Sequence, residues 1–201
     1  MKAPLILGLG FALCLLLTSC VVTSDNPLSS PDTAHVDQAL VGDWFGKKDQ
    51  DTFHFSVTNV PWMHVVITHK QADQKPDEYD FFPTVIGNNT FLNVVLIGKD
   101  DQGHPTKSYV FVRYLISSDH VLRRWMMSRD AMAAAVRAGR LKGTVHQDKN
   151  PMMVGDPPHP DVDVTLQDTS VNMVKFILGV DLTALFNDKM EPLYRVKATG
   201  K

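Results

Sequence analysis

The sequence predicts a mainly β fold, in which an antiparallel meander closes into a barrel or half-barrel and two short helices follow near the C-terminus. Three observations predict it. Short apolar and aromatic runs follow one another from about residue 37. Clusters of Gly, Asn and Pro, such as Gly87-Asn88-Asn89, separate these runs and mark turns. Helical spacing of apolar residues is confined to two later segments.

The expected strands recur at short intervals. The run TFHFSVTN alternates Phe53, Phe55 and Val57 with polar residues, which is the pattern of a half-buried strand. The run FLNVVLIG is apolar on both faces, as expected for a strand between a core and a covering element. We expect strands at residues 40–48, 52–59, 62–70, 78–87, 90–98, 107–117 and 120–127, and two later ones at 162–166 and 192–196.

Two helices are expected after the meander. In SRDAMAAAVRAG, Ser128 is placed as the N-cap and Gly139 as the residue past the C-terminal end. In TSVNMVKFILG, Thr169 or Ser170 offers the N-cap, and Asp181 can start a further turn. Helical spacing then predicts apolar faces made of Met132, Ala135 and Val136 in the first helix and of Val171, Val174 and Leu178, with Ile177 beside them, in the second.

The N-terminal segment has the pattern of a cleaved secretory signal. Lys2 precedes an uncharged apolar run from Leu5 to Leu17, which would span only about 20 Å as a helix. A bilayer core of ~30 Å needs a longer run, so this segment is too short for a transmembrane helix. It matches the apolar region of a signal peptide, which is removed from the mature protein.

The residues Leu17-Thr18-Ser19-Cys20 resemble the lipobox of bacterial lipoproteins. The resemblance implies cleavage between Ser19 and Cys20 and acylation of Cys20, whose several acyl chains would hold the protein at a membrane lastingly. Val21 stands where an Asp commonly marks inner-membrane retention, so the resemblance favours the outer membrane, and we expect the periplasmic face. The alternative is an ordinary signal peptide in which Cys20 is incidental.

We therefore expect three parts: residues 1–19 as a cleaved signal, 20–36 as a lipidated cysteine with a flexible tether, and 37–201 as one β domain. The tether is expected because VVTSDNPLSSPDTAH has little apolar area to offset the entropy of ordering. The stretch 147–161 contains four prolines and no periodicity, so we expect a disordered or loose surface loop rather than a lid.

Composition argues against several functions. Loss of Cys14 with the signal and acylation of Cys20 leave no pair for a disulfide. A net charge of −2 without a basic stripe argues against nucleic-acid binding. Eight histidines are present, but none has metal-ligand spacing, and no hydrolase or dinucleotide-binding motif occurs outside the signal. We expect no cofactor, no metal and no enzyme activity, although a site assembled across the fold stays an alternative.

The run VGDW and a late arginine suggest a particular barrel. Gly42, Trp44 and Arg195 resemble the Gly-x-Trp strand and C-terminal Arg of lipocalins and their calycin relatives. The resemblance implies that Arg195 packs over Trp44 and closes the barrel base, a contact worth ~0.5–2 kcal/mol. The chain also resembles a group of uncharacterised bacterial lipoproteins that contain a segment like GRLKGTV, residues 139–145 here.

A ligand pocket is the remaining candidate site. Arg123 and Trp125 share one strand face, and Trp62 lies in another apolar strand. If they faced the barrel interior, they could hold a small apolar or anionic amphiphilic ligand, although each Trp is more simply a core residue. The other reading is a filled core and an outer surface that docks an envelope protein. An interior cavity of ~300–1,000 Å³ would distinguish the two.

Overall fold

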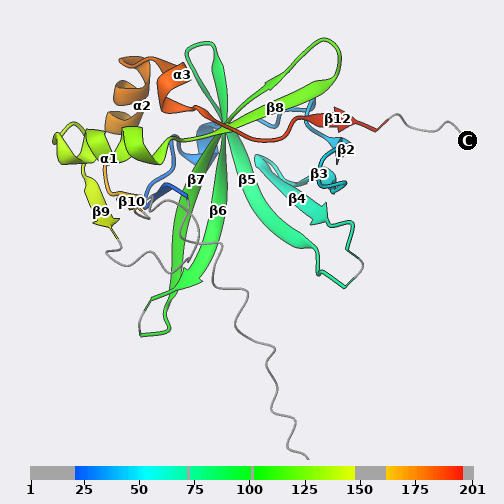
Figure 1. The fold of residues 1–201 in the computed structure, drawn as a ribbon, viewed down its shortest axis with the longest axis horizontal. Coiled ribbons are helices and arrows are strands. Elements are labelled where there is room, and N and C mark those ends of the chain that lie inside the picture. The colour runs from blue at the N-terminus through cyan, green and yellow to red at the C-terminus, as the bar shows by residue number, and fades with distance from the viewer. Residues whose placement is uncertain (1–20, 72, 101, 148–161, 197–201) are drawn as a thin grey trace, which may run out of the picture.

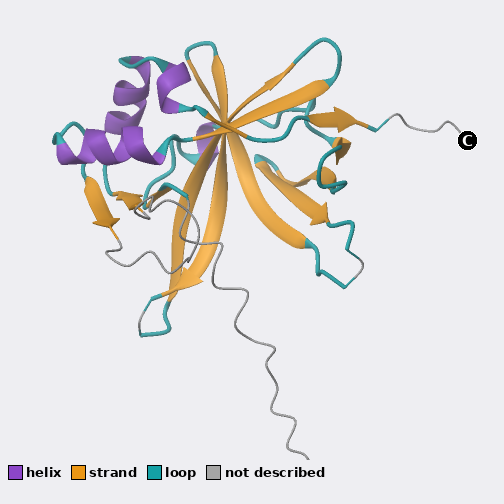
Figure 2. Cartoon of the chain, in the orientation of Figure 1, coloured by secondary structure: helices purple, strands orange, loops and turns teal. Residues whose placement is uncertain are grey.

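The computed structural model describes residues 21–71, 73–100, 102–147 and 162–196. The predicted fold class is confirmed, because the chain is mainly β and builds a closed antiparallel barrel with short helices late in the sequence. Figure 2 shows the helices gathered on one side of the molecule, beside the long strands. In the part of the chain that is described, no helix is long and apolar enough to cross a membrane.

Eight strands form the barrel (Figure 1). Consecutive strands from β2 to β8 pair antiparallel, and β12 lies between β8 and β2 and completes the ring. The barrel strands are β2 (Gly42–Gly46), β3 (Thr52–Asn59), β4 (Trp62–Thr68), β5 (Asp77–Ile86), β6 (Asn89–Lys99), β7 (Pro105–Ile116), β8 (Val121–Met126) and β12 (Leu193–Arg195). The bounds of these strands lie close to the predicted ones.

The sheet continues beyond the barrel at one edge of β7. Strand β8 pairs with Val112–Ile116 of β7. Strand β1 (Thr23–Ser24) pairs with the same edge of β7 nearer its N-terminal end, where Ser24 lies opposite Tyr109. Strand β10 (Val162–Leu166) then pairs parallel with β1, and β9 (Gly143–Gln147) pairs antiparallel with β10. At the other end, β11 (Asp188–Lys189) pairs with β8.

The helices begin at the predicted caps. They are α1 (Arg129–Arg137), α2 (Ser170–Leu178) and the single turn α3 (Leu182–Leu185), with a 3-10 turn η1 at Pro31–Thr33. The side chains of Ser128, Thr169 and Asp181 each accept a hydrogen bond from a backbone N–H of the first turn. Gly139 has a φ of +68°, the left-handed conformation that ends α1.

Helix α2 buries only part of the predicted face. Ile177 is buried as predicted and Val174 packs against the second core, whereas Val171 is 75% exposed and Leu178 is 63% exposed. The prediction was wrong for Val171 and Leu178, and it missed the buried Met173, because spacing alone could not select among several apolar stripes. Contact with the N-terminal segment decides it: the Ser24 hydroxyl lies 3.4 Å from the Met173 sulfur.

Two cores share one wall. The barrel core fills the ring with Leu40, Trp44, Phe55, Met63, Val65, Phe81, Leu92, Val110, Val112, Tyr114, Leu122 and Leu193. The second core lies between the outer face of β5–β7 and the helices, and it includes Val22, Leu28, Phe82, Ile86, Phe91, Phe111, Met127, Met132, Leu166, Met173 and Ile177. The central parts of strands β5 to β7 are thus buried on both faces, as predicted for the run FLNVVLIG, although Ile97 in that run is exposed.

The segment expected to be a flexible tether is folded from its first described residues. Val22 is 2% exposed, and Ser24 and Leu28 are also buried. The Leu28 N–H donates to the side-chain oxygen of Asn93 at 2.7 Å, and the Asn93 amide donates to the carbonyl of Phe82 and the hydroxyl of Thr84. The ordered domain therefore begins by Val22 rather than at residue 37.

The tether prediction failed for a physical reason. Its composition argument assumed that the segment would have to build a core of its own. Instead, the few apolar side chains of the segment pack on a sheet that other strands provide, and buried polar groups of that sheet bond its backbone. The predicted signal with Cys20 and the predicted loop at 147–161, apart from Gln147 at the end of β9, lie outside the described residues.

Candidate functional site

The structure brings the predicted closing pair, Trp44 and Arg195, together. Trp44 is fully buried in β2, and the guanidinium carbon of Arg195 in β12 lies 4.8 Å from its ring centroid. Arg195 donates to the carbonyls of Ala39 at 2.6 Å and Val41 at 3.0 Å, while the Trp44 indole donates to that of Leu40 at 2.7 Å. The pair thus ties the first and last barrel strands to the chain that enters the barrel.

The backbone conformation at position 42 explains why the residue two positions before Trp44 is a glycine. Its φ of +117° lies in a region that side-chain-bearing residues rarely adopt, so the backbone can turn sharply from Val41 into β2. A Cβ at Gly42 would also lie 3.9 Å from a guanidinium nitrogen of Arg195. The glycine and the arginine therefore belong to one arrangement.

The residues of the predicted pocket, Arg123 and Trp125 in β8, share a strand face, but that face is the outer one. Leu122 and Met126 belong to the interior, so alternation directs Arg123 and Trp125 outward. Arg123 donates to the Ser117 hydroxyl at 2.6 Å, and Trp125 packs at the border of the second core. They therefore do not line a barrel interior.

Trp62, the third predicted pocket residue, also lies outside the barrel. Its ring meets that of Phe82 edge to face at 5.0 Å, and the Lys107 ammonium lies 5.2 Å from its centroid. Trp62 and Trp125 are both partly buried at the border of the second core. The structure does not assemble Arg123, Trp125 and Trp62 around one cavity.

The inward-facing cation is Arg124, which sequence reasoning missed. Arg124 is 8% exposed, its guanidinium lies 4.8 Å from the Phe53 ring centroid, and it donates to the carbonyl of Glu191 at 3.1 Å. Burial lowers the pKa of Arg124 to about 10, and its Nε finds no hydrogen-bond partner among the described residues. Alternation identifies Arg124 as inward only once Leu122 is known to face the interior, which the sequence does not show.

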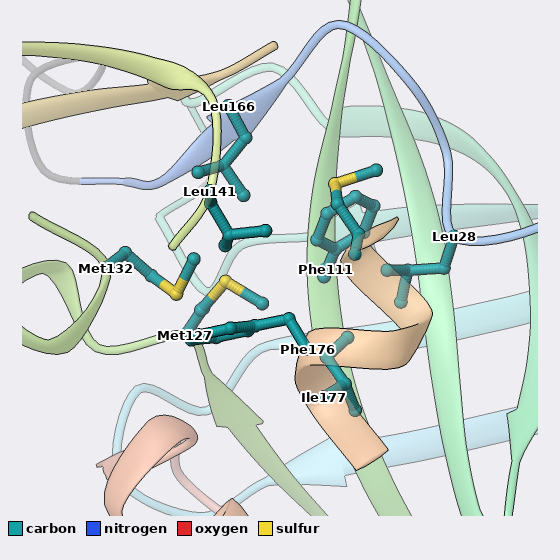
Figure 3. A pocket seen from close by; sticks show the side chains of 9 residues that line it. Leu28, Phe111, Met127, Met132, Leu141, Leu166, Phe176 and Ile177 are labelled. Atoms are coloured by element: carbon teal, nitrogen blue, oxygen red, sulfur yellow. The ribbon is translucent and has the colours of Figure 1, made fainter. Parts of the chain in front are cut away.

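The pockets described by the structure lie outside the barrel. One is an apolar space of about 10 Å³ in the second core (Figure 3), enough for a single water but for no larger ligand. Figure 3 shows side chains from the sheet, from α2 and from the N-terminal segment converging on it. The other, of about 170 Å³, lies between η1 and β5 and is lined by Ser29, Thr33, Ala34, His35, Pro83, Thr84 and Val85.

Histidine–carboxylate pairs line the outer face of β2 to β5. The closest nitrogen of His54 lies 2.6 Å from Asp43, and that of His64 lies 2.8 Å from Asp80. No group of three such ligands among the described residues has a geometry that could hold a metal ion.

His69, just past the end of β4, joins the turn before β3 to the start of β5. Its two ring nitrogens lie 3.1 Å from Asp51, in the turn before β3, and 3.1 Å from Asp77 in β5. Burial lowers the pKa of His69, but the hydrogen bonds and charges of Asp77 and Asp51 outweigh burial, so the pKa is raised. The arrangement favours the doubly protonated ring, which donates to both carboxylates.

No protein-family model, no curated protein and no solved structure shows a significant match to this chain. The fold alone describes the class of protein. It is a closed eight-stranded antiparallel barrel whose sheet extends past the ring, and helices cover a second core on the outer face of that sheet.

Proposed function

We propose that this protein is an envelope lipoprotein that acts as an interaction module, with its barrel domain docking a protein partner rather than carrying a ligand inside the ring. The observation that carries this proposal is the filled barrel core. Trp44, Phe81 and Leu122 are among its fully buried side chains, and the two described pockets lie elsewhere. Ligand sites usually need ~300–1,000 Å³ of preformed space.

Opening the barrel to a ligand would be costly. Removing one buried Phe side chain from a core costs about 3–5 kcal/mol, and displacing one to admit a ligand forfeits contacts of the same kind. The charged group inside is also already engaged, because Arg124 packs on Phe53 and bonds to the Glu191 carbonyl. These contacts favour a ring whose role is to hold a rigid outer surface.

The proposed anchor is Cys20, placed in the outer membrane and facing the periplasm. Its support is the apolar run ending in Leu17-Thr18-Ser19-Cys20. Mass spectrometry of the full-length gene product extracted from bacterial membranes should find an N-terminal peptide that begins at Cys20 and carries acyl chains. Cys20→Ala should leave the unprocessed, unacylated chain. A mature chain that begins elsewhere, or an unmodified Cys20, would contradict the anchor.

The filled barrel is tested separately by native mass spectrometry of the full-length product, released gently from its own membranes. We expect the mass of the acylated chain alone after detergent removal. Cross-linking in intact cells should then give a discrete adduct with a protein, and unfolding the domain with Trp44→Ala should abolish it. A co-purifying small apolar mass in stoichiometric amount would instead support a ligand carrier.

A further inference from the structure

We propose that an extended, basic segment of a protein partner pairs with the edge of β6 at the place where the sheet splits between β5 and β6. The split lies between residues 77–80 of β5 and residues 95–99 of β6. This inference rests on the proposed function as an interaction module. It goes further because it assigns the docking site and the chemistry of the partner.

The register shows where the sheet splits. Strand β6 pairs with residues 81–86 of β5, and this pairing ends where Phe81 lies opposite Val94. Past that point, residues 77–80 of β5 pair only with β4, and residues 95–99 of β6 pair only with β7. Figure 1 shows β4 and β5 running away from β6 and β7 on the lower side of the molecule. Each side of the split therefore presents an edge that no described strand covers.

Backbone donors and acceptors of β6 point into the split. The Asp100 N–H donates to the His104 carbonyl at 2.9 Å, which marks these residues as a hydrogen-bonded pair of the β6–β7 ladder. Such pairs alternate along antiparallel strands, so Leu96 and Gly98 bond to β7. Ile97, between them, turns its N–H and its carbonyl toward β5. An extended peptide matches such an edge because its own backbone offers the complementary groups.

The side chains of this edge leave it unprotected. Natural proteins usually blunt an exposed strand edge with charges, proline or a short strand. Residues 95–98 include neither a charge nor a proline, and Ile97 is 71% exposed. On the inner face, Tyr79 and Leu96 pack on the barrel core but are only partly buried. A partner strand with apolar residues on its inner side would cover both.

Two carboxylates across the split favour a basic partner. Glu78 and Asp80 lie on the outer face of β5, with side chains that are 62% and 61% exposed. They share one imidazole, because the nitrogens of His64 lie 3.5 Å from Glu78 and 2.8 Å from Asp80. One imidazole carries at most one positive charge, so the group keeps a negative charge. Since opposite charges on neighbouring strands attract, Lys or Arg on the outer side of the partner strand would fit here.

Strand β9 offers a competing edge without this charge. It pairs only with β10, and its sequence GTVHQ contains no acidic residue. The Gln167 N–H donates to the Lys142 carbonyl at 2.9 Å, so alternation turns the backbone groups of Val145 away from β10. The β9 edge is therefore the matched control for the β6 edge.

Peptide binding tests the proposed chemistry. The probe is a dye-labelled peptide of about seven residues in which Val alternates with Lys, a length that spans the edge as one strand. Fluorescence polarisation with the full-length gene product should show that it binds about tenfold more tightly than the same peptide with Glu in place of Lys. A Lys peptide with every backbone nitrogen methylated should not bind. Absent binding of the Lys peptide, or equal binding of any two of these peptides, would overturn the proposal.

Proline variants test the edge. Ile97→Pro removes the N–H that faces the split and keeps those that bond to β7, a position where strands tolerate proline. Val145→Pro makes the same change on β9. Ile97→Pro should weaken binding of the Lys peptide about tenfold, and Val145→Pro should leave it unchanged. Circular dichroism checks that both variants fold. The reverse result would assign docking to β9 and overturn the proposal.

Charge reversal tests the same site without a backbone change. Replacing Glu78 and Asp80 together by Lys should make the Glu peptide the tighter ligand. Asp43→Lys is the control, since Asp43 also lies on the outer face, is 54% exposed and contacts a histidine, His54, at 2.6 Å. A preference for the Lys peptide that survives the double change, or that disappears in Asp43→Lys, would contradict the assigned partner chemistry.

Cross-linking in intact cells separates this inference from the proposed function. An adduct that is lost in Ile97→Pro and kept in Val145→Pro supports both. An adduct that persists in Ile97→Pro would retain the proposed function and overturn only the docking site. Peptide binding without any adduct in cells would contradict the proposed function and leave the preference of the β6 edge established. A dimer that Ile97→Pro dissociates would show that a second copy occupies the split, and would overturn the proposal.

Discussion

The barrel core and the second core are built in opposite ways. The barrel core takes inward residues from eight strands, most of them neighbours in both sequence and space. The second core gathers residues from the N-terminal segment, the outer face of β5–β7, three helices and β10. The first depends on local pairing and the second on contacts between distant parts of the chain, but both use strands β5–β7.

Phe81 and Phe82 make the sharpest test of whether the two cores unfold together. They are neighbours in β5 and both are fully buried, but Phe81 points into the barrel core and Phe82 into the second core. Each change to Ala should lower the free energy of unfolding by about 3–5 kcal/mol. Because the two cores share β5–β7, denaturant unfolding followed by circular dichroism should remain a single transition in both variants.

A two-step transition in Phe82→Ala alone would show that the second core unfolds independently. The exposed neighbour Val85→Ala provides the control, since its side chain is 71% exposed and its loss should change stability little.

Asn93→Ala should weaken the second core more selectively. The change leaves the Leu28 N–H without its acceptor and the Thr84 hydroxyl without the amide that donates to it. An unsatisfied buried group costs about 1–3 kcal/mol. Hydrogen exchange should speed up in residues 21–35 by at least tenfold, while β2 and β3 keep their protection. Uniform acceleration across both regions would contradict this local role, and Asn88→Ala in the exposed turn is the control.

Arg195→Met should weaken the closure of the barrel core. The change keeps an apolar side chain over Trp44 but removes the cation from the ring face and the donors to Ala39 and Val41. We expect a loss of about 1 kcal/mol in the free energy of unfolding. Exchange should accelerate in β12 and β2 and not in α2. Arg123→Met, on the outer face of β8, is the matched control.

The smallest expected effect is a pH dependence confined to the barrel wall. The raised pKa of His69 means that its ion pairs with Asp51 and Asp77 stabilise the fold fully below the unfolded value of 6.5 and are lost as pH rises through the folded pKa. The contribution should be at most about 1 kcal/mol, as for other solvent-screened pairs.

His69→Asn should therefore cost stability at pH 5 and nearly nothing at pH 9, measured by urea unfolding. His146→Asn in β9 is the comparison from the other side of the molecule. A cost of His69→Asn that is larger at pH 9 than at pH 5 would contradict the assigned direction.

The two cores also differ in how well the sequence predicted them. Alternation in runs such as TFHFSVTN and the turns between them predicted the barrel strands closely, because a half-buried strand repeats every two residues. Strands β1, β9 and β11 were missed. Strands β1 and β11 have only two residues each, and all three are defined by pairing with other segments rather than by a pattern of their own.

The candidate site shows the same limit. The contact of Arg195 with Trp44 could be anticipated because a family resemblance linked two distant positions. The pocket around Arg123 and Trp125 could not be judged from the sequence, since two residues on one face give no sign of whether that face is inside. The interior position of Arg124 depends on the closure of the ring, which places Leu122 against the strands opposite.

Strand β12 gives the barrel a fixed order of assembly. Residues 193–195 fill the gap between β2 and β8 and follow every other barrel strand in the sequence. While the chain is being made, the ring therefore has two unpaired edges until residues 193–195 are available. Arg195 reaches the ring of Trp44 only at that last step, so the contact that closes the barrel forms after every other barrel strand has been made.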